Sequence, residues 1–194
     1  MRNAEFDREQ VLRAAMNAFL HKGYAKTSMQ ALTKATGLHP GSIYCAFENK
    51  RGLLLASLEQ YKQDRNDEFQ QFFIQERPVL DSLKAYIDNI VTECNSCDTA
   101  KACLLTKSLS ELAEQDESIK IFISEVLEQW QQSLSAKFEQ AKKLGELTTT
   151  KDSKHLARYL VMGIYGLRTF AHTHPQSAVI QQLADQLYED LCRE

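Results

Sequence analysis

Hydrophobic residues recur along this chain three and four positions apart, which is the spacing of an amphipathic helix, and almost nowhere alternate as in a strand. Near the start, Val11, Ala15 and Phe19 follow this spacing and predict one buried helix face. Asp7 can cap the beginning of that helix, and Gly23 can end it in the left-handed conformation that glycine tolerates. The pattern therefore predicts a first helix between these two residues.

Two short helices are predicted next. Thr27 and Gln30 have the spacing of a capping box, which opens the first short helix, and Gly37 ends it. Pro40 suits the first turn of the second, where its missing N–H removes no hydrogen bond. Two short helices joined by a tight turn form a helix-turn-helix over residues 27–47, whose second helix can enter a DNA major groove.

The rest of the chain is also predicted to be helical. Asn49 can cap a long helix that reaches Phe72 and ends before Pro78. Further helices are expected at about 79–94, 101–113, 117–144, 153–171 and 176–192. We therefore expect an all-α fold of about nine helices, in which a helix-turn-helix domain of residues 1–50 precedes a ligand-sensing and dimerisation body of residues 51–194.

Charge divides the chain in the same way. Residues 1–51 contain eight Lys or Arg and four Asp or Glu, a net charge of +4, although the whole chain has a net charge of −3. The remaining residues therefore carry a net charge of −7. The N-terminal end is suited to a polyanion such as DNA, and the rest of the chain is not.

Side chains suited to DNA contacts gather around the helix-turn-helix. Ser42, Tyr44 and Cys45 lie opposite the apolar positions of the second helix and offer small or hydrogen-bonding groups. Thr27 and Lys50 stand at helix N-termini, which attract phosphate. The alternatives are a packed ring for Tyr44, a cap for Thr27 and a solvated charge for Lys50. The predicted DNA contacts are Thr27, Ser28, His39, Pro40, Gly41, Ser42, Tyr44, Cys45 and Lys50.

Residues 7–58 resemble the N-terminal domain of TetR-family repressors. The resemblance rests on residues at the family's spacing, which are Phe19, Gly23-Tyr24, Thr27, Gly37-Leu38, Gly41-Ser42-Ile43-Tyr44, Phe47 and Lys50. It implies an Ω-shaped homodimer on a near-palindromic operator, an inducer pocket in the C-terminal body and release of DNA when that pocket fills. It also implies phosphate contacts by Tyr44 and Lys50 and a contact by Thr27. Pro40 and Cys45 depart from the family's usual residues, so the operator sequence stays open.

The cysteines suggest a second mode of sensing. An odd number of five cysteines in a reducing cytosol predicts thiols rather than structural disulfides. Ala102-Cys103-Leu104 resembles the Gly-Cys-Leu element that opens helix six in a subset of TetR-family repressors, some of which respond to electrophiles or oxidants. A helix N-terminus and nearby lysines can stabilise a Cys103 thiolate, and the alternative is a core cysteine. The redox candidates are Cys103, Cys94 and Cys97.

A pocket for an inducer is the other expectation for the body. Aromatic side chains there can provide apolar walls, and Arg168 can attach an anion, although residues at this spacing are also typical of plain core. The predicted ligand contacts are Phe69, Phe73, Tyr86, Cys103, Lys107, Trp130, Tyr159, Met162, Tyr165 and Arg168.

The last two predicted helices are candidates for the interface of a homodimer. Each has an apolar stripe, and small residues between the stripes permit close approach of helices. Packed across a twofold axis, they would set two DNA-binding heads about 34–36 Å apart, in successive major grooves. The predicted interface residues are Leu156, Leu160, Gly163, Ile164, Leu167, Ile180, Leu183 and Leu187.

Other classes of protein fit less well. The sequence contains no Gly-rich phosphate loop, nucleophile elbow or paired-His motif, so we expect neither an enzyme nor a cofactor. Cys94, Cys97 and Cys103 could supply thiolates to a zinc ion, and His172 and His174 are conceivable partners. The fourth ligand is not assigned, and no metal is predicted. No apolar run reaches the roughly 18 residues of a membrane span, and no secretory signal is present, so we expect a cytoplasmic protein. The alternatives that stay open are a helical interaction module without DNA binding and a metal-binding helical protein.

Overall fold

The computed structural model describes residues 6–73, 77–96, 103–175 and 178–192, and every regular element in these ranges is a helix. The predicted all-α class is thus confirmed. Contacts divide the chain into two compact units, unit 1 of Met1–Arg65 and Cys103–Ile123 and unit 2 of Asn66–Ala102 and Ser124–Glu194. These units are defined by contacts. The predicted boundary between a DNA-binding and a sensing domain, at residues 50 and 51, stays a prediction.

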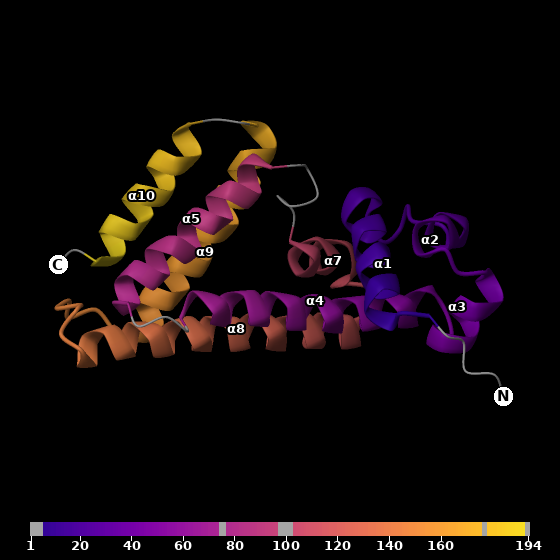
Figure 1. Cartoon of the computed structure of the whole chain (residues 1–194), viewed down its shortest axis with the longest axis horizontal. Helices are drawn as coiled ribbons and strands as arrows, with labels where there is room; N and C mark the ends of the chain where they lie inside the picture. The colour runs from indigo at the N-terminus through magenta and orange to yellow at the C-terminus, as the bar shows by residue number, and fades with distance from the viewer. Residues whose placement is uncertain (1–5, 74–76, 97–102, 176–177, 193–194) are drawn as a thin grey trace. The chain divides into compact units, whose positions relative to one another are not determined.

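Unit 1 contains the helix-turn-helix. Its helices are α1 (Arg8–Lys22), α2 (Met29–Thr36), α3 (Pro40–Phe47), the first part of α4 (Lys50–Phe72), α7 (Leu104–Leu112) and the start of α8 (Glu117–Lys143) (Figure 1). The carboxylate of Asp7 accepts a hydrogen bond from the backbone N–H of Gln10 at 3.1 Å, and Gly23 ends α1, both at the predicted positions. The backbone of Gly23 has a positive φ of 77° but a ψ of 163°, so it does not adopt the left-handed helical conformation that was expected.

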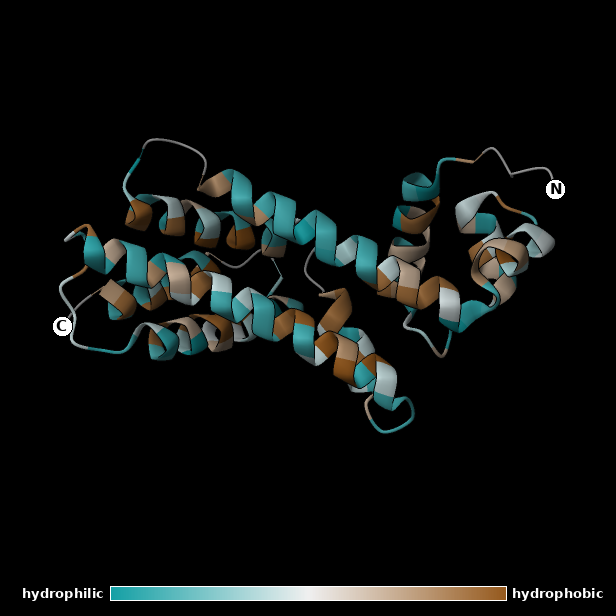
Figure 2. Ribbon diagram, turned by 90° about the horizontal axis from the view of Figure 1, so that it is seen from below, coloured by the Kyte–Doolittle hydropathy of each residue, from teal (hydrophilic) through white to brown (hydrophobic). Residues whose placement is uncertain are grey.

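The core of unit 1 is formed by the apolar faces of these helices. Hydrophobic and hydrophilic residues both occur along these helices in Figure 2. The hydrophobic sides supply side chains that are no more than 1% exposed, among them Phe19, Leu32, Ile43, Leu53 and Leu54. Because α2 and α3 have only eight residues each, this packing rather than intrinsic helix propensity stabilises them.

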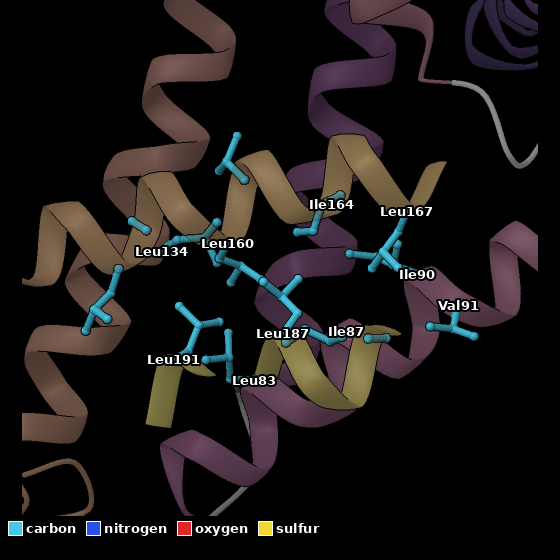
Figure 3. Close-up of a cluster of buried hydrophobic side chains, with 14 of the residues drawn as sticks. Leu83, Ile87, Ile90, Val91, Leu134, Leu160, Ile164, Leu167, Leu187 and Leu191 are labelled. Atoms are coloured by element: carbon cyan, nitrogen blue, oxygen red, sulfur yellow. The ribbon is translucent and has the colours of Figure 1, made fainter. Parts of the chain in front are cut away.

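Unit 2 is a helical body. It contains the second part of α4, α5 (Val79–Asn95), most of α8, α9 (Ser153–Thr173) and α10 (Val179–Cys192). Leucine, isoleucine and valine side chains of α5, α9 and α10 point toward one another in Figure 3. These helices therefore share one apolar core. No helix in the described ranges is both long and apolar enough to cross a membrane.

The core of unit 2 contains most of the residues that were predicted for the dimer interface. Seven of the eight predicted residues are covered by their own chain, and only Leu183 is exposed, at 42%. The space beside Gly163 is filled by its own chain, because a Cβ added there would lie 2.4 Å from a methyl group of Leu187. The apolar stripes of α9 and α10 pack against each other and against α5. The predicted interface residues that are covered in this way are Leu156, Leu160, Gly163, Ile164, Leu167, Ile180 and Leu187.

Candidate nucleic-acid interface

Helix α3 presents one face to solvent and the other to the core of unit 1. Ile43 is fully buried and Phe47 is 5% exposed, whereas Tyr44 is 49% exposed. Of the other predicted contacts on or beside this helix, His39, Pro40, Gly41 and Cys45 are exposed and Ser42 is half-buried. The spacing of exposed positions places Pro40, Gly41, Tyr44 and Cys45 on one side of α3, which is available to a macromolecule.

A tight turn fixes α3 relative to α4. Glu48 adopts a positive φ of 66°, and its backbone N–H donates to the carbonyl of Tyr44 at 2.9 Å. Asn49 then caps α4, since its side-chain oxygen accepts a hydrogen bond from the N–H of Gly52 at 2.9 Å. A Cβ on Gly52 would lie only 2.0 Å from the carbonyl oxygen of Phe47, so this position requires glycine.

Lys50 contacts an aromatic ring instead of extending freely into solvent. It is the first residue of α4, and its ammonium nitrogen lies 4.3 Å from the centre of the Tyr24 ring. This is the geometry of a cation–π interaction. Burial lowers the pKa of Lys50, while the nearby carboxylate of Glu111 acts in the opposite direction.

Thr27 differs from its prediction. Its side chain is fully buried, and its hydroxyl donates to the carbonyl oxygen of Gly23 at 2.6 Å. The cap of α2 is Ser28, whose hydroxyl accepts a hydrogen bond from the N–H of Ala31 at 3.1 Å. The capping box predicted at Thr27 is therefore wrong, because Ser28 caps the helix. The hydroxyl of Thr27 is turned into the unit and already donates its proton, and the DNA contact of this residue stays a prediction. Ser28 remains an exposed candidate.

Helix α7 braces the segment that joins α1 to α2. The ammonium of Lys107 donates to the carbonyl of Leu20, in the last turn of α1, at 2.6 Å. The carboxylate of Glu111 accepts from the N–H of Ala25 at 3.1 Å, and a Cβ on Gly23 would lie 2.3 Å from the same carboxylate. Lys107 therefore caps the end of α1, and its predicted role as a ligand contact stays a prediction.

An ion pair joins the start of α4 to the start of α8. The guanidinium of Arg51 donates to both carboxylate oxygens of Asp116, at 2.5 and 2.9 Å. Asp116 also accepts a hydrogen bond from the N–H of Ile119 at 3.2 Å, so it caps α8. The bond with Arg51 holds the pKa of the Asp116 carboxyl well below its usual range. Neither Glu111 nor Asp116 was predicted as functional, because no local pattern reveals a partner 65 or more residues away.

Comparison with known proteins connects this geometry to a family. Residues 11–57 match the N-terminal model of bacterial regulatory proteins of the tetR family, and residues 79–187 match the tetracyclin repressor-like C-terminal domain. The second match alone covers more than half of the chain. The chain belongs to the TetR family.

Individual relatives agree with this assignment. The HTH-type transcriptional repressor ComR of Escherichia coli K12 is 28% identical over 180 residues, which are 92% of this chain and 86% of ComR. The uncharacterised HTH-type regulator YezE of Bacillus subtilis 168 is 28% identical over 160 residues, 82% of each chain.

Solved structures share the TetR-family fold. A cysteine mutant of the regulator CifR, in a complex with 26bp operator DNA, has a TM-score of 0.82 at 22% identity and covers 98% of both chains. The reduced form of Escherichia coli NemR has a TM-score of 0.83 at 19% identity, over 93% of this chain and 94% of NemR. At these identities the similarity shows the fold alone.

Within unit 2 of this TetR-family chain, several predicted ligand contacts do lie together. The ring of Phe69 lies 4.8 Å from that of Phe73 and 5.1 Å from that of Tyr86. The indole N–H of Trp130 donates to the hydroxyl of Tyr86 at 3.1 Å, and the Trp130 ring lies 6.2 Å from that of Tyr165. Burial raises the pKa of Tyr86, so its hydroxyl stays protonated. We call these five residues the aromatic cluster.

The other predicted ligand contacts are placed differently. Arg168 forms an ion pair with Glu93 at 2.5 Å, with both side chains less than a fifth exposed, so a carboxylate of the chain already occupies the predicted anion site. Met162 is 61% exposed, and Tyr159 lines a shallow hollow beside Asp190. Cys103 belongs to unit 1 rather than to the unit that holds the aromatic cluster.

The redox candidates also differ from one another. Cys103 is half-buried and immediately precedes α7, where its carbonyl accepts from the N–H of Lys107 at 3.0 Å. Cys94 is fully buried in the core of unit 2, and Cys97 lies outside the described residues. In the described part of the chain, no group of three or more His, Cys, Asp or Glu residues could hold a metal ion. His172 and His174 are both exposed.

Proposed function

We propose that this chain is a repressor that binds a near-palindromic operator as a homodimer and releases it when an effector acts on the protein. The observation that carries the proposal is the exposed face of α3, set on a helix-turn-helix whose apolar side is buried. The name of ComR describes a repressor, and the CifR structure contains operator DNA, which supports the same activity here. The net charge of +4 on residues 1–51 favours a polyanionic partner.

Two side chains are assigned to the phosphate backbone. The exposed hydroxyl of Tyr44 can donate to a phosphate oxygen without any rearrangement. Lys50 lies at the N-terminus of α4, where the helix dipole also attracts an anion, and its ammonium would leave the Tyr24 ring to reach a phosphate. The remaining candidates on and beside α3 then lie close to base edges.

The test is a binding measurement at several salt concentrations, with DNA from around the chain's own coding region. Tyr44→Ala should weaken binding by about tenfold, since a lost hydrogen bond to a charged group is worth about 1.5 kcal/mol. Lys50→Ala should also reduce the slope of affinity against salt concentration by about one ion. Tyr44→Phe, which keeps the ring and removes only the hydroxyl, should weaken binding to a similar extent, and the control is Lys143→Ala, which removes an exposed charge from unit 2. If both variants, Tyr44→Ala and Lys50→Ala, bind with the affinity and salt slope of the natural protein, the proposed interface is wrong. An affinity of the natural protein for DNA that does not change with salt concentration would favour an interaction module.

We assign the contact with the second protomer of the homodimer to the outward sides of α9 and α10. Met162 is 61% and Leu183 42% exposed, so both apolar side chains are available to a partner. Gly166 is exposed between turns of α9, and a Cβ there would meet no described atom within 4 Å, so a partner helix can approach closely. This face replaces the buried stripes that the sequence favoured.

The effector is assigned either to the aromatic cluster or to Cys103. An adduct on Cys103 would disturb the first turn of α7, because the backbone N–H of Lys107 donates to the Cys103 carbonyl. The side chain of the same lysine holds the end of α1. A ligand in the aromatic cluster would act without Cys103. The two modes are separated by measuring DNA release. Electrophiles, oxidants and small aromatic compounds are added to the DNA complexes of the natural protein and of Cys103→Ser. If the variant keeps the full response to every electrophile and oxidant, the thiol is not the sensor.

A further inference from the structure

Helix α3 lacks the side chains that usually read bases. Its eight residues, Pro40-Gly41-Ser42-Ile43-Tyr44-Cys45-Ala46-Phe47, include no Arg, Lys, Asn, Gln, Asp or Glu. Those are the residues that form bidentate hydrogen bonds with guanine or adenine, or accept from cytosine. On the exposed side, the only strong hydrogen-bonding group beyond the half-buried Ser42 is the hydroxyl of Tyr44. Recognition by this helix must therefore depend on something other than paired hydrogen bonds.

Gly41 gives the second observation. It lies inside α3, where glycine destabilises a helix relative to alanine. Its φ is not in the left-handed region, and a Cβ added there would meet no atom within 4 Å in the described part of the chain. Nothing described in the folded chain therefore requires glycine at this position. The open space beside Gly41 would let a molecule outside the chain come close to the helix backbone.

The neighbours of Gly41 on the exposed side are weakly polar. Pro40 offers an apolar ring, and Cys45 offers a small thiol that is a poor hydrogen-bond donor. In the major groove, the one base feature that such groups contact favourably is the methyl group of thymine. The chemistry of this surface thus matches a particular base feature.

We propose that α3 recognises its operator through apolar contacts of Pro40 and Cys45 with thymine methyl groups, and that Gly41 permits the close approach that these contacts need. The inference rests on the proposed DNA binding and specifies how that site reads sequence. Charged and amide side chains for the phosphate backbone come from outside α3, and Gln30 and Lys34 on α2 are both exposed.

The first experiment removes the methyl groups from the DNA. A site selected by the full-length protein from random duplexes is resynthesised with deoxyuridine in place of thymidine, one half-site position at a time. Each contacted methyl should contribute about a three- to fourfold difference in affinity, the value of one buried methyl group. Cys45→Ser, which makes the side chain polar at nearly constant size, should bind the thymidine site more weakly and lose most of this difference.

The second experiment separates the role of Gly41 in binding from its role in folding. Gly41→Ala should raise the melting temperature by about 1–4 °C, because alanine favours the helix, and yet weaken operator binding by about tenfold, because its methyl group fills the space for DNA. Asn66→Ala, an exposed helix substitution in unit 2, is the control that should leave binding unchanged.

The outcomes separate this inference from the proposed function. Equal affinity for thymidine and deoxyuridine sites, or undiminished binding by Gly41→Ala, overturns the recognition mode while DNA binding itself stands. Failure of the natural protein to select any site from the random duplexes overturns the proposed function.

Discussion

Helix α1 in unit 1 and helix α9 in unit 2 are held in place by different means. Besides its apolar face, α1 is tied by polar side chains from distant segments, since Lys107 bonds to the carbonyl of Leu20 and Arg13 pairs with Asp64 at 2.8 Å. Helix α9 meets α5 and α10 mainly through a large apolar core that includes Leu160, and the ion pair of Arg168 with Glu93 of α5 lies beside that core. The two packing modes have different energetic consequences, since apolar burial is worth more than a partly exposed polar contact.

The contrast extends to the predicted sites. On α3, burial of one side left the predicted contact residues on the surface, whereas on α9 burial covered the residues predicted to meet a partner. An apolar stripe on a helix predicts that the stripe is buried, but it does not say whether the same chain or another one covers it. The following predictions test this contrast, from the largest expected effect to the smallest.

The core position of Leu160 can be tested against the exposed Met162 two residues further along α9. Leu160→Ala should lower the free energy of unfolding by about 2–5 kcal/mol, because it opens a cavity among fully buried leucines. Met162→Ala should change the same quantity by less than about 0.5 kcal/mol when both variants are measured at a protein concentration low enough to keep the protein monomeric. Urea denaturation monitored by circular dichroism measures both. Similar losses for the two variants would mean that the two sides of α9 do not differ.

The outward side of α9 can be tested for dimer formation. Met162→Asp should weaken self-association by about 1–3 kcal/mol, since twofold symmetry would bring two carboxylates to an apolar contact. Sedimentation equilibrium at several protein concentrations measures the dissociation constant. Thr148→Asp adds the same charge at an exposed loop position and should leave association unchanged. An unaltered dimer in Met162→Asp would place the interface elsewhere.

The polar brace on α1 can be removed with one substitution. Lys107→Ala should cost about 1–2 kcal/mol of stability and expose the last turn of α1, because a charged donor to the Leu20 carbonyl is lost. Hydrogen exchange of α1 amides reports the local effect, and Lys120→Ala, which removes an exposed lysine from α8, is the control. Unchanged exchange in α1 would show that apolar packing alone holds this helix.

The smallest effect is expected from acid at Asp116. Its pKa is lower in the folded state than in the unfolded state because of Arg51, so its contribution to stability is complete above the ordinary carboxyl pKa. That contribution is lost as the pH falls below this range toward the lowered pKa. Asp116→Asn should therefore destabilise the protein by about 0.5–1 kcal/mol at pH 7 and by less near pH 3. Equal losses at both pH values would contradict the ion pair's role.

Much of the fold was predictable because its signals are local. Asp7, Gly23 and Gly37 act on groups within a few residues, and the structure places the helix ends close to them. The capping residue of α2 was misassigned by one position, since Thr27 and Ser28 have the same capping chemistry and only burial distinguishes them. The helix-turn-helix was recognisable for the same reason, because its turn glycines and apolar spacing lie within one short stretch.

By itself the sequence determined the all-helical class, the helix-turn-helix and the exposed side of α3, since periodicity and capping depend on neighbouring residues. Only the tertiary structure decided which surface meets the apolar stripe of α9, that Lys107 and Glu111 brace the start of the helix-turn-helix, and that Arg168 is paired with Glu93. These facts depend on contacts between residues tens of positions apart. A stripe or a charge has many chemically equivalent partners in the chain, and packing selects one of them.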